Sequence, residues 1–295
     1  MIEQALYRHL QEQDALAPYL ATYANKMAIF NQEAPSDKDQ YWGEGPQYGR
    51  VVFSVDLQGD PERTMGGTLT LDILCKEDEQ FPEEIEPIIR PLIHGYFFCK
   101  QKFVVSAQWK NTSYFTEPER HVTGCTVSFD LLAFPVSTYA PHVIDQFNEW
   151  SSGFENIHVI NHAPLPTEAW KPGNGQSAVY WRAAKEEPTN WIRPTFATVW
   201  RTATVKGYIF SETPAQAAEV ANALTIQLYA DKRLKKNGEL LRAGESPIMV
   251  NSKITVDNGA DPLRVGQLTI EAVYGVIVYE EPSENVIQNI NFRRL

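Results

Sequence analysis

One hydrophobic pattern occurs twice in this chain, over residues 68–134 and again over residues 203–278. In each copy, a stretch that alternates apolar and polar residues leads into one with apolar residues three or four apart, and two more alternating stretches follow. Alternation is the period of a β-strand, and three-to-four spacing is that of a helix. The strand-like stretches are 68–75, 103–109, 122–134, 203–210, 248–256 and 265–278, and the helical ones are 81–96 and 214–230.

A four-residue turn precedes the final strand of each copy. It reads Glu117-Pro-Glu-Arg120 in the first copy and Asp261-Pro-Leu-Arg264 in the second. The two copies have few identical residues, and what they share is the order and spacing of their elements. A repeat of this length indicates a tandem duplication of one folding unit.

Matching elements also come before each copy. Residues 2–23 have apolar residues mostly three or four apart, which predicts a helix with a kink near Asp14, and residues 140–150 predict a second, shorter helix. Irregular stretches that contain Pro and Gly follow at 31–47 and 161–176. Further strands are predicted at 51–55, 178–184 and 196–210.

These elements predict an α+β fold in two tandem, similar domains. Each domain is expected to be an antiparallel β-sheet with a helix packed on one face, plus an N-terminal helix. We place the first domain at residues 1–137 and the second, divergent copy of the same unit at 138–280. Residues 281–295 have little to bury and are predicted to be a C-terminal arm that orders on a partner.

The length and composition fit a folded protein of two domains. The 295 residues are 43% hydrophobic and 21% charged, as in ordinary globular chains. No stretch approaches ~18 consecutive apolar residues, so we expect no transmembrane helix. The first residues lack the basic and apolar pattern of a signal peptide, which predicts an intracellular site of synthesis.

The negative charge is concentrated in the first half of the chain. The formal charge is −11, of which residues 1–137 contribute −9 and the remainder −2. Phosphate binding needs clustered Lys and Arg, so this composition argues against a protein that grips nucleic acid. Two interpretations of the acids stay open: a solvated face that keeps the protein soluble, or the wall of a channel that repels DNA.

No residues form a recognisable catalytic, cofactor-binding or metal-binding motif. His158 and His162 are four apart, but the chain between them looks extended, and this spacing brings metal ligands together only on a helix. The nucleophile-elbow, phosphate-loop and dinucleotide-binding patterns are absent. Cys75, Cys99 and Cys125 lie in or beside apolar strands and are predicted to be buried free thiols. We therefore expect no catalysis, no cofactor and no metal.

The tryptophans divide into two groups. Trp109, Trp181 and Trp200 lie in strand patterns and are predicted to belong to the core. A second group lies in or beside turn-rich segments, where exposed aromatic rings often contact partners. The candidate partner contacts from this group and its neighbours are Trp42, Tyr41, Trp170 and Trp191. The alternative, in which each ring folds back over its own loop, stays open.

Charged residues at two other places are further candidate partner contacts. Glu186 and Glu187 lie at the tip of a predicted hairpin that projects from the second sheet, and Arg293 and Arg294 lie at the end of the predicted arm. Adjacent acids point apart on a strand, whereas a glycosidase needs two carboxylates that converge in a cleft. We therefore expect the paired acids to be solvated.

Several segments of the first half resemble the tail-terminator, or tail-completion, proteins of tailed bacteriophages and phage-tail-like particles. The segments are the opening Met1-Ile-Glu-Gln-Ala-Leu-Tyr-Arg-His-Leu10, the irregular Ile29-Phe-Asn-Gln-Glu-Ala-Pro35, the strand at 48–55, and the Asp60-Pro-Glu-Arg63 turn before Gly-Thr-Leu-Thr-Leu. The resemblance covers residues 1–134, and residues 140–279 repeat the architecture with weaker agreement. Members of that family are usually single domains of about half this length, so this chain is similar to a doubled form.

The resemblance implies a ring. In that family six copies cap the tail tube, end polymerisation of the tube and, where present, of a sheath, and present a joining surface to the neck. The implied partners are copies of the chain itself, the tail-tube protein, and sheath and neck or connector proteins. Three chains could form a pseudo-hexamer of six domains, or six chains could place one domain on the tube and the other outside; both stay open.

The resemblance also implies a location and a passage for DNA. The protein would be assembled in the host cytoplasm into the tail or neck of a virion or tail-like particle, with no membrane contact. DNA would pass through the lumen without specific binding, past candidate lumen acids Glu83, Glu84 and Glu86. One alternative is a head–tail connector or a sheath- or baseplate-associated protein. Another is a small-molecule enzyme or binding protein with a polar pocket between the halves.

Overall fold

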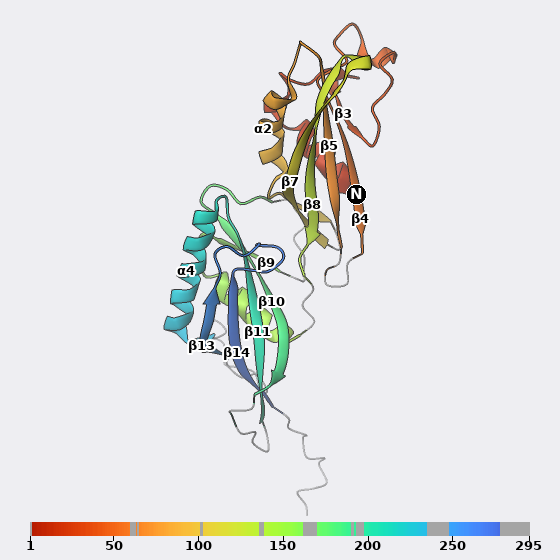
Figure 1. The fold of residues 1–295 in the computed structure, drawn as a ribbon. Helices are drawn as coiled ribbons and strands as arrows, with labels where there is room; N and C mark the ends of the chain where they lie inside the picture. Colours follow the sequence, from red (N-terminus) through yellow and green to blue (C-terminus); the bar gives the residue numbers. More distant parts are fainter. Residues whose placement is uncertain are drawn as a thin grey trace, which may run out of the picture.

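The computed structural model describes residues 2–59, 63, 65–100, 103–135, 139–161, 170–189, 192, 198–234 and 248–277. Two curled β-sheets, each with helices on one face, follow one another along the chain and lie end to end (Figure 1). We call residues 2–135 the N-terminal domain and residues 139–277 the C-terminal domain. The predicted α+β fold with two tandem units is confirmed.

The two sheets have the same strand order. In the N-terminal domain the order is β3 (Ile29–Asn31), β4 (Arg50–Gln58), β5 (Gly66–Lys76), β8 (Val122–Ala133), β7 (Phe103–Glu117) and β6 (Phe97–Lys100). In the C-terminal domain it is β9 (Ile157–Ile160), β10 (Ser177–Pro188), β11 (Thr198–Phe210), β14 (Leu268–Ile277), β13 (Ile248–Val256) and β12 (Arg233–Leu234). Each strand therefore has a counterpart in the same place, so the duplication extends to the whole topology.

Hydrogen-bond register extends this match to single residues. Leu69 pairs with Phe129 across β5 and β8, and Val205 pairs with Ile270 across β11 and β14. All four side chains are buried on the helix-covered face of their sheets. The register is continuous along these strands, so matching these two pairs to each other assigns a counterpart in the other domain to every residue along them.

A bulge carries the same ion pair in both sheets. The register shifts near Lys110 in β7 and near Lys253 in β13, where the chain has residues in excess of its partner strand. The Lys110 Nζ lies 3.5 Å from the Asp130 Oδ1 on β8, and the Lys253 Nζ lies 2.7 Å from the Glu271 Oε1 on β14. Asp130 and Glu271 are counterparts in the register, so the duplication preserved this pair.

The four-residue turns also adopt related conformations. Arg120 donates from Nη1 to Glu117 at 3.2 Å, and Arg264 donates from Nη1 to Asp261 at 2.8 Å. In both turns the arginine therefore folds back onto the acid that precedes the proline. The first turn is the short 3₁₀ helix Pro118–Arg120.

Among the described residues, four α-helices pack on one face of the sheets: α1 (Ile2–Gln11), α2 (Pro82–Ile93), α3 (Pro141–Ser151) and α4 (Pro214–Asp231). Local signals fix where they begin. Helix α2 starts with Pro82 and has Glu83 and Glu84 in its first turn, where proline loses no hydrogen bond and acids face the positive end of the helix. Helix α4 is capped by Thr213, whose hydroxyl accepts from the Gln216 amide at 3.2 Å.

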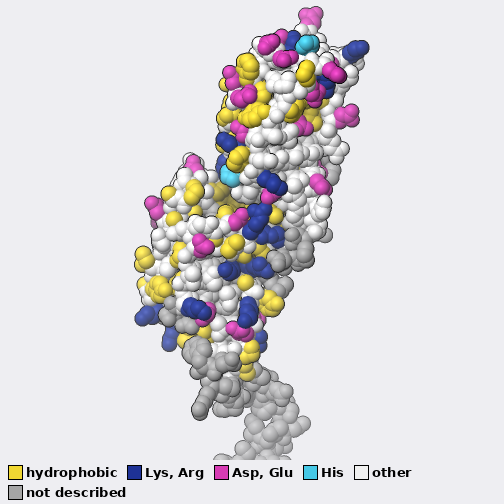
Figure 2. Space-filling model, in the orientation of Figure 1, with side chains coloured by type: hydrophobic (Ala, Val, Ile, Leu, Met, Phe, Trp, Pro, Cys, Tyr) yellow, Lys and Arg dark blue, Asp and Glu magenta, His cyan; other side chains and the backbone are white. Residues whose placement is uncertain are grey.

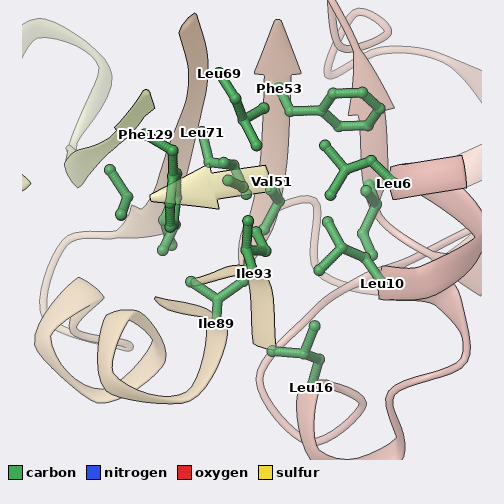
Figure 3. Close-up of a cluster of buried hydrophobic side chains, with 14 of the residues drawn as sticks. Leu6, Leu10, Leu16, Val51, Phe53, Leu69, Leu71, Ile89, Ile93 and Phe129 are labelled. Carbon is green, nitrogen blue, oxygen red and sulfur yellow. The ribbon is translucent and has the colours of Figure 1, made fainter. Parts of the chain in front are cut away.

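The core of the N-terminal domain lies between its two helices and its sheet. Leu6 and Leu10 of α1 and Ile89 and Ile93 of α2 point toward Val51, Phe53, Leu69, Leu71 and Phe129 of the strands (Figure 3). All nine side chains are buried. Burial of a leucine or isoleucine contributes roughly 1.5–3 kcal/mol, so the three-to-four spacing and the alternation together specify this face.

The sequence-based prediction was wrong in two details of the sheets and one helix. Strands β3 and β9 run parallel to β4 and β10, so neither sheet is purely antiparallel. A parallel pair needs a crossover, and the irregular stretches after β3 and β9 provide the chain length for it. The predicted helix at 2–23 ends at Gln11, and a short 3₁₀ turn, Asp14–Leu16, follows.

Of the three predicted core tryptophans, only Trp181 lies in a domain core, and Trp200 belongs to neither core. Trp181 is fully buried, and its Nε1 donates to the Ser151 hydroxyl at 2.7 Å. Trp200 is half-buried. The prediction was also wrong for Trp109, whose side chain is 39% exposed because it lies beyond the end of α2, with the Arg90 guanidinium 4.8 Å from its ring centroid.

Substitution of Gly207 by alanine tests the packing of the second core. A β-carbon at Gly207 would lie 2.5 Å from Cζ3 of the Trp181 indole. The ring cannot move freely, because it is buried and hydrogen-bonded, so we expect Gly207→Ala to lower the free energy of unfolding by about 1–3 kcal/mol. Urea denaturation measures this, and Gly45→Ala, where the nearest atom would be 3.8 Å away, is the control. Equal stability of the two variants would contradict the packing described.

Candidate functional site

An apolar cluster joins the two domains. The side chain of Phe134, just after β8, stacks on Tyr180 of β10 with ring centroids 4.4 Å apart. Phe97 of β6 lies 5.1 Å from Phe210 of β11 and 5.6 Å from Trp170. The buried members are Phe97, Val104, Phe134, Ile160, Ala178, Tyr180, Tyr208, Phe210 and Leu263. Because both domains contribute, this joint is a continuous small core rather than a flexible linker.

Buried hydrogen bonds give the joint its geometry. Arg63 donates from Nη1 to the carbonyl of Ala133 and from Nη2 to the carbonyl of Leu263, both at 2.7 Å, and so links the domains. The Tyr180 hydroxyl donates to the Pro135 carbonyl at 2.6 Å. Burial raises the pKa of the Tyr180 phenol, which therefore stays a donor at any physiological pH.

Two further contacts cross the joint at its surface. Phe97 and Trp170 exchange backbone hydrogen bonds of 2.7 and 3.1 Å as an isolated antiparallel bridge. Arg264, in the turn of the C-terminal domain, donates from Nη2 to the Asp130 Oδ2 of β8 at 2.6 Å. Asp130 thus receives Lys110 from its own domain and Arg264 from the other.

The joint connects unlike ends of two like units. The C-terminal domain contributes the end that carries its Asp261–Arg264 turn, and the N-terminal domain contributes the end where β8 finishes. The corresponding turn of the N-terminal domain, Glu117–Arg120, lies at the far end of its sheet, because it joins the other ends of β7 and β8 (Figure 1). The contact is therefore heterologous: it uses one end of each domain and leaves the other end of each domain available for a further contact.

The free end of the N-terminal domain contains a hollow of about 570 Å³. Its lining includes Arg50, Asp72, Glu117 and Arg120. It occupies the position at which the C-terminal domain has Tyr180, Tyr208 and Phe210, since their register counterparts are Val52, Asp72 and Leu74. Smaller or polar side chains in place of three aromatic rings leave this space.

A buried arginine lies in the hollow. Arg50 is only 3% exposed, donates to Asp37 at 2.7 Å, and lies 4.7 Å from the centroid of the Tyr48 ring. Within the described residues its Nε has no hydrogen-bond partner. Burial acts to raise the pKa of Asp37, but hydrogen bonds from Arg50 and Tyr48 outweigh it and hold that pKa below its ordinary value. The Arg50 charge is therefore balanced by Asp37, and its buried Nε is a donor left unused among the described residues.

A second cleft, of about 710 Å³, lies beside the joint and is lined by both domains. Lys171 donates to the Pro91 carbonyl there, and the His94 Nδ1 accepts from the Trp109 amide at 3.0 Å. Burial lowers the pKa of both Lys171 and His94. This cleft lies between the halves, where the alternative of a small-molecule protein places its pocket.

The uncovered faces of the two sheets differ in charge. On the N-terminal sheet this face carries Ser and Thr with three acids and the basic residues Arg50 and Lys110, and on the C-terminal sheet it carries four basic residues with the acids Glu187 and Glu271. The three acids are Asp56, Asp72 and Asp130, and the four basic residues are Arg182, Lys185, Lys206 and Lys253. Figure 2 shows Asp and Glu gathered on the upper domain and Lys and Arg over the strands of the lower one.

The structure separates the candidate partner contacts. Tyr41 is 59% exposed, whereas Trp42 is 3% exposed, in a cluster with Tyr23 and Phe30. Trp42 thus folds back over its own loop, the alternative stated above, and the buried ring does not offer a surface to a partner. Trp170 is half-buried in the joint, where it contacts the other domain of its own chain. Trp191, Arg293 and Arg294 lie outside the described residues.

The hairpin acids are both paired. Glu186 accepts from the Tyr274 hydroxyl and lies 2.5 Å from the Arg201 Nε. Burial acts to raise the pKa of Glu186, but these two donors outweigh it and lower that pKa. Glu187 is exposed and lies 2.5 Å from the Lys185 Nζ. Only Glu187 is therefore placed as the sequence suggested, as a solvated side chain.

The candidate lumen acids also differ from one another. Glu83 and Glu84 are exposed in the first turn of α2. Glu86 is only 5% exposed: it accepts from the Thr112 hydroxyl at 2.9 Å and lies 3.4 Å from the Arg90 Nε. The inclusion of Glu86 was wrong, because helical spacing turns it toward β7 while its two neighbours face solvent.

The described residues contain no cluster of His, Cys, Asp and Glu that could hold a metal ion. His158 lies in strand β9 and stacks on Trp170, and His162 lies outside the described residues. Cys75 and Cys125 are buried free thiols as predicted, and burial raises the pKa of each to about 12, which makes both poor nucleophiles. The side chain of Cys99 is outside the described set.

Among the described helices, none has the length and apolarity that a membrane crossing requires. Comparison of the sequence with protein-family models and with curated proteins, and of the structure with solved structures, gives no match. The candidate sites are therefore the joint between the domains and the two free ends of the stacked domains.

Sequence reasoning missed the residues that build the joint. Arg63, Phe134 and Tyr180 lie at strand ends, where a hydrophobic pattern does not say what a ring packs against. One signal was present: the repeated turn motif that ends in Arg120 and Arg264 pointed to a preserved contact, although not to its partner Asp130.

Phe134→Ala tests the joint. Loss of the ring removes its stacking on Tyr180 and leaves a cavity, so we expect the free energy of unfolding to fall by about 3 kcal/mol. We also expect one cooperative transition to split into two in calorimetry, because the domains no longer unfold as one unit. Tyr114→Ala, which removes an aromatic ring that is 51% exposed, is the matched control. A single, unshifted transition in Phe134→Ala would show that the domains are not coupled here.

Asp37→Asn tests the charge in the hollow. We expect a loss of about 1–2 kcal/mol at pH 7, since Arg50 stays buried without its anion while the half-exposed carboxylate is screened by solvent. The pKa of Asp37 is lowered in the folded state, so its contribution is present above the ordinary pKa near 3.8 and is lost as the pH falls through the folded value. Urea unfolding from pH 7 to pH 2 should therefore bring wild type and variant together. The exposed Glu119→Gln is the control, and a difference that persists at pH 2 would rule out the ion pair as its source.

Proposed function

We propose that this chain is a structural assembly protein whose copies form a ring that caps a tubular tail, ends polymerisation of the tube and offers a joining surface to the neck. The observation that carries the proposal is the end-to-end joint between two domains of identical strand order, which gives each chain two stacked layers. Chains placed side by side would then form a ring two layers deep, provided that the rotation between neighbours closes. The likeness of residues 1–134 to tail terminators supports the same function.

The form of the joint favours six chains over three. It offsets the two sheets along their strands, so a chain extends through two layers instead of supplying two neighbours to one layer (Figure 1). In this arrangement one layer sits on the last ring of the tube and the other faces the neck or a surrounding sheath. The rigid joint, with Arg63 buried between the domains, passes load from one layer to the next.

The charge distribution supports a passage for DNA through the N-terminal layer. Glu83 and Glu84 are exposed on this domain, and the open face of its sheet carries acids, so phosphate would be repelled from its surface. The basic open face of the C-terminal sheet suits an acidic protein partner. The protein acts by shape and charge in this proposal and needs no catalysis, cofactor or metal.

Two alternatives remain. A head–tail connector or a sheath- or baseplate-associated protein would use the same ring and the same stacked domains at another place in the particle. A small-molecule enzyme or binding protein is favoured by one observation, the cleft beside the joint with Lys171 and His94. That cleft lacks a nucleophile and base within hydrogen-bond reach among the described residues, so we rank it below the structural function.

Native mass and imaging test the proposal. We expect purified protein to form rings of six chains, seen by light scattering and negative-stain microscopy, either alone or on the ends of purified tail tubes. Rings of three chains would be consistent with the capping function but would contradict the proposed number of six chains. A monomer that also leaves tube ends bare would overturn the proposal. Lys171→Ala is the control, because it changes the cleft without touching the free ends and should leave ring formation intact.

A further inference from the structure

The joint inside the chain provides a template for a contact between chains. Its parts are duplicated: each domain has a receiving end, with the turn arginine, and an inserting end, with the acid of the last strand. One receiving end and one inserting end are used inside the chain. The receiving end of the N-terminal domain and the inserting end of the C-terminal domain are left over, and they lie at opposite ends of the molecule (Figure 1).

The leftover receiving end keeps the charged part of the joint. Arg120 matches Arg264 in the turn motif, although not in the strand register, and makes the same contact with the acid of its own turn. Its side chain is 53% exposed, close to the 48% of Arg264, which nevertheless reaches an acid of the other domain. Beside it lies the hollow of about 570 Å³ with the buried Arg50, whose Nε is unpaired within the described residues.

The leftover inserting end keeps the matching acid and an apolar strand end, but not the stacking ring, because the counterpart of Phe134 is Gly275. Glu271 is the counterpart of Asp130, and like it holds the lysine of a bulge. Arg63 and Pro135, which pair at the centre of the internal joint, correspond to Val199 and Val276. These valines are 37% and 36% exposed, so an apolar end stands uncovered where its counterpart in the other domain is buried.

We infer that a second copy of this chain inserts its Val199–Val276 end into the Arg50–Arg120 hollow, with Glu271 of that copy bound to Arg120 as Asp130 is bound to Arg264. The contact is end to end and heterologous, so it builds an open linear series rather than a closed dimer. It does not rest on the proposed function, because it concerns the free ends of the chain whatever the assembly caps.

The free contact is weaker than the internal joint. Val52, Asp72 and Leu74 replace three aromatic rings of the receiving end, so less apolar area is buried and a larger share of the attraction is ionic. Such a contact is reversible and sensitive to salt, since exposed ion pairs are screened. The apolar joint therefore holds the two domains of one chain together, while the weaker contact between chains can form and dissociate.

Charge reversal with exchange tests the inference on the full chain. In sedimentation velocity at low salt, we expect wild-type protein to show a concentration-dependent series of end-to-end oligomers that shrinks as salt is raised. Arg120→Glu and Glu271→Arg should each raise the dissociation constant at least tenfold. An equimolar mixture of the two variants, and the double variant, should restore association, because each broken contact then meets its reversed partner.

The controls separate this result from misfolding and from ring formation. Glu84→Arg makes the same change of charge as Glu271→Arg, but on the exposed first turn of α2, and should leave the end-to-end oligomers unchanged. Circular dichroism checks the fold, and Glu271→Gln serves if reversal beside Lys253 disturbs it. Rings of chains placed side by side can be told apart from the end-to-end oligomers, because rings reach a fixed number of chains and should still form in Arg120→Glu. Wild-type protein that stays monomeric at every concentration, or an end-to-end series that neither reversal weakens, would overturn the inference.

Discussion

The stack of Phe134 on Tyr180, sealed by Arg63, is the interaction on which the form of the whole molecule depends. Without it the chain would be two small domains on a linker, each with its own helix-covered sheet. With it, the end of one sheet continues into the core of the next, and the molecule becomes one rigid rod. The buried guanidinium matters as much as the rings, because its two carbonyl contacts fix the rotation of one domain on the other.

The duplication explains why such a joint could arise. Two copies of one unit present identical ends at first, and contact between unlike ends gives a series that repeats along one direction. In this chain the internal contact became apolar, with Tyr180, Tyr208 and Phe210 on the receiving side. The free receiving end stayed polar, with Asp72 and Arg50. If the inferred contact between chains exists, one contact between like units has two forms, one apolar within the chain and one largely ionic between chains.

The charge pattern follows the same division. The N-terminal domain carries most of the negative charge, while the open face of the C-terminal sheet has four basic residues against the two acids Glu187 and Glu271. Long-range charge of this kind orients partners and excludes phosphate, but it does not decide a fold. In the proposed ring, the end-to-end arrangement places the two domains in separate layers, and their different charges favour different partners for each layer.

The hydrophobic pattern was enough to predict the long strands, the helices and the internal repeat, because alternation and three-to-four spacing decide which side chains share a face. It did not determine the short strands β3, β6, β9 and β12, whose few residues carry no period, or the parallel pairing of two of them. Only the tertiary structure decided that Glu86 and Trp42 are buried, that Trp109 is exposed, and that Phe134 meets Tyr180. Local pattern reports which way a side chain points within its own element, whereas contact between elements far apart in the chain depends on how whole sheets pack.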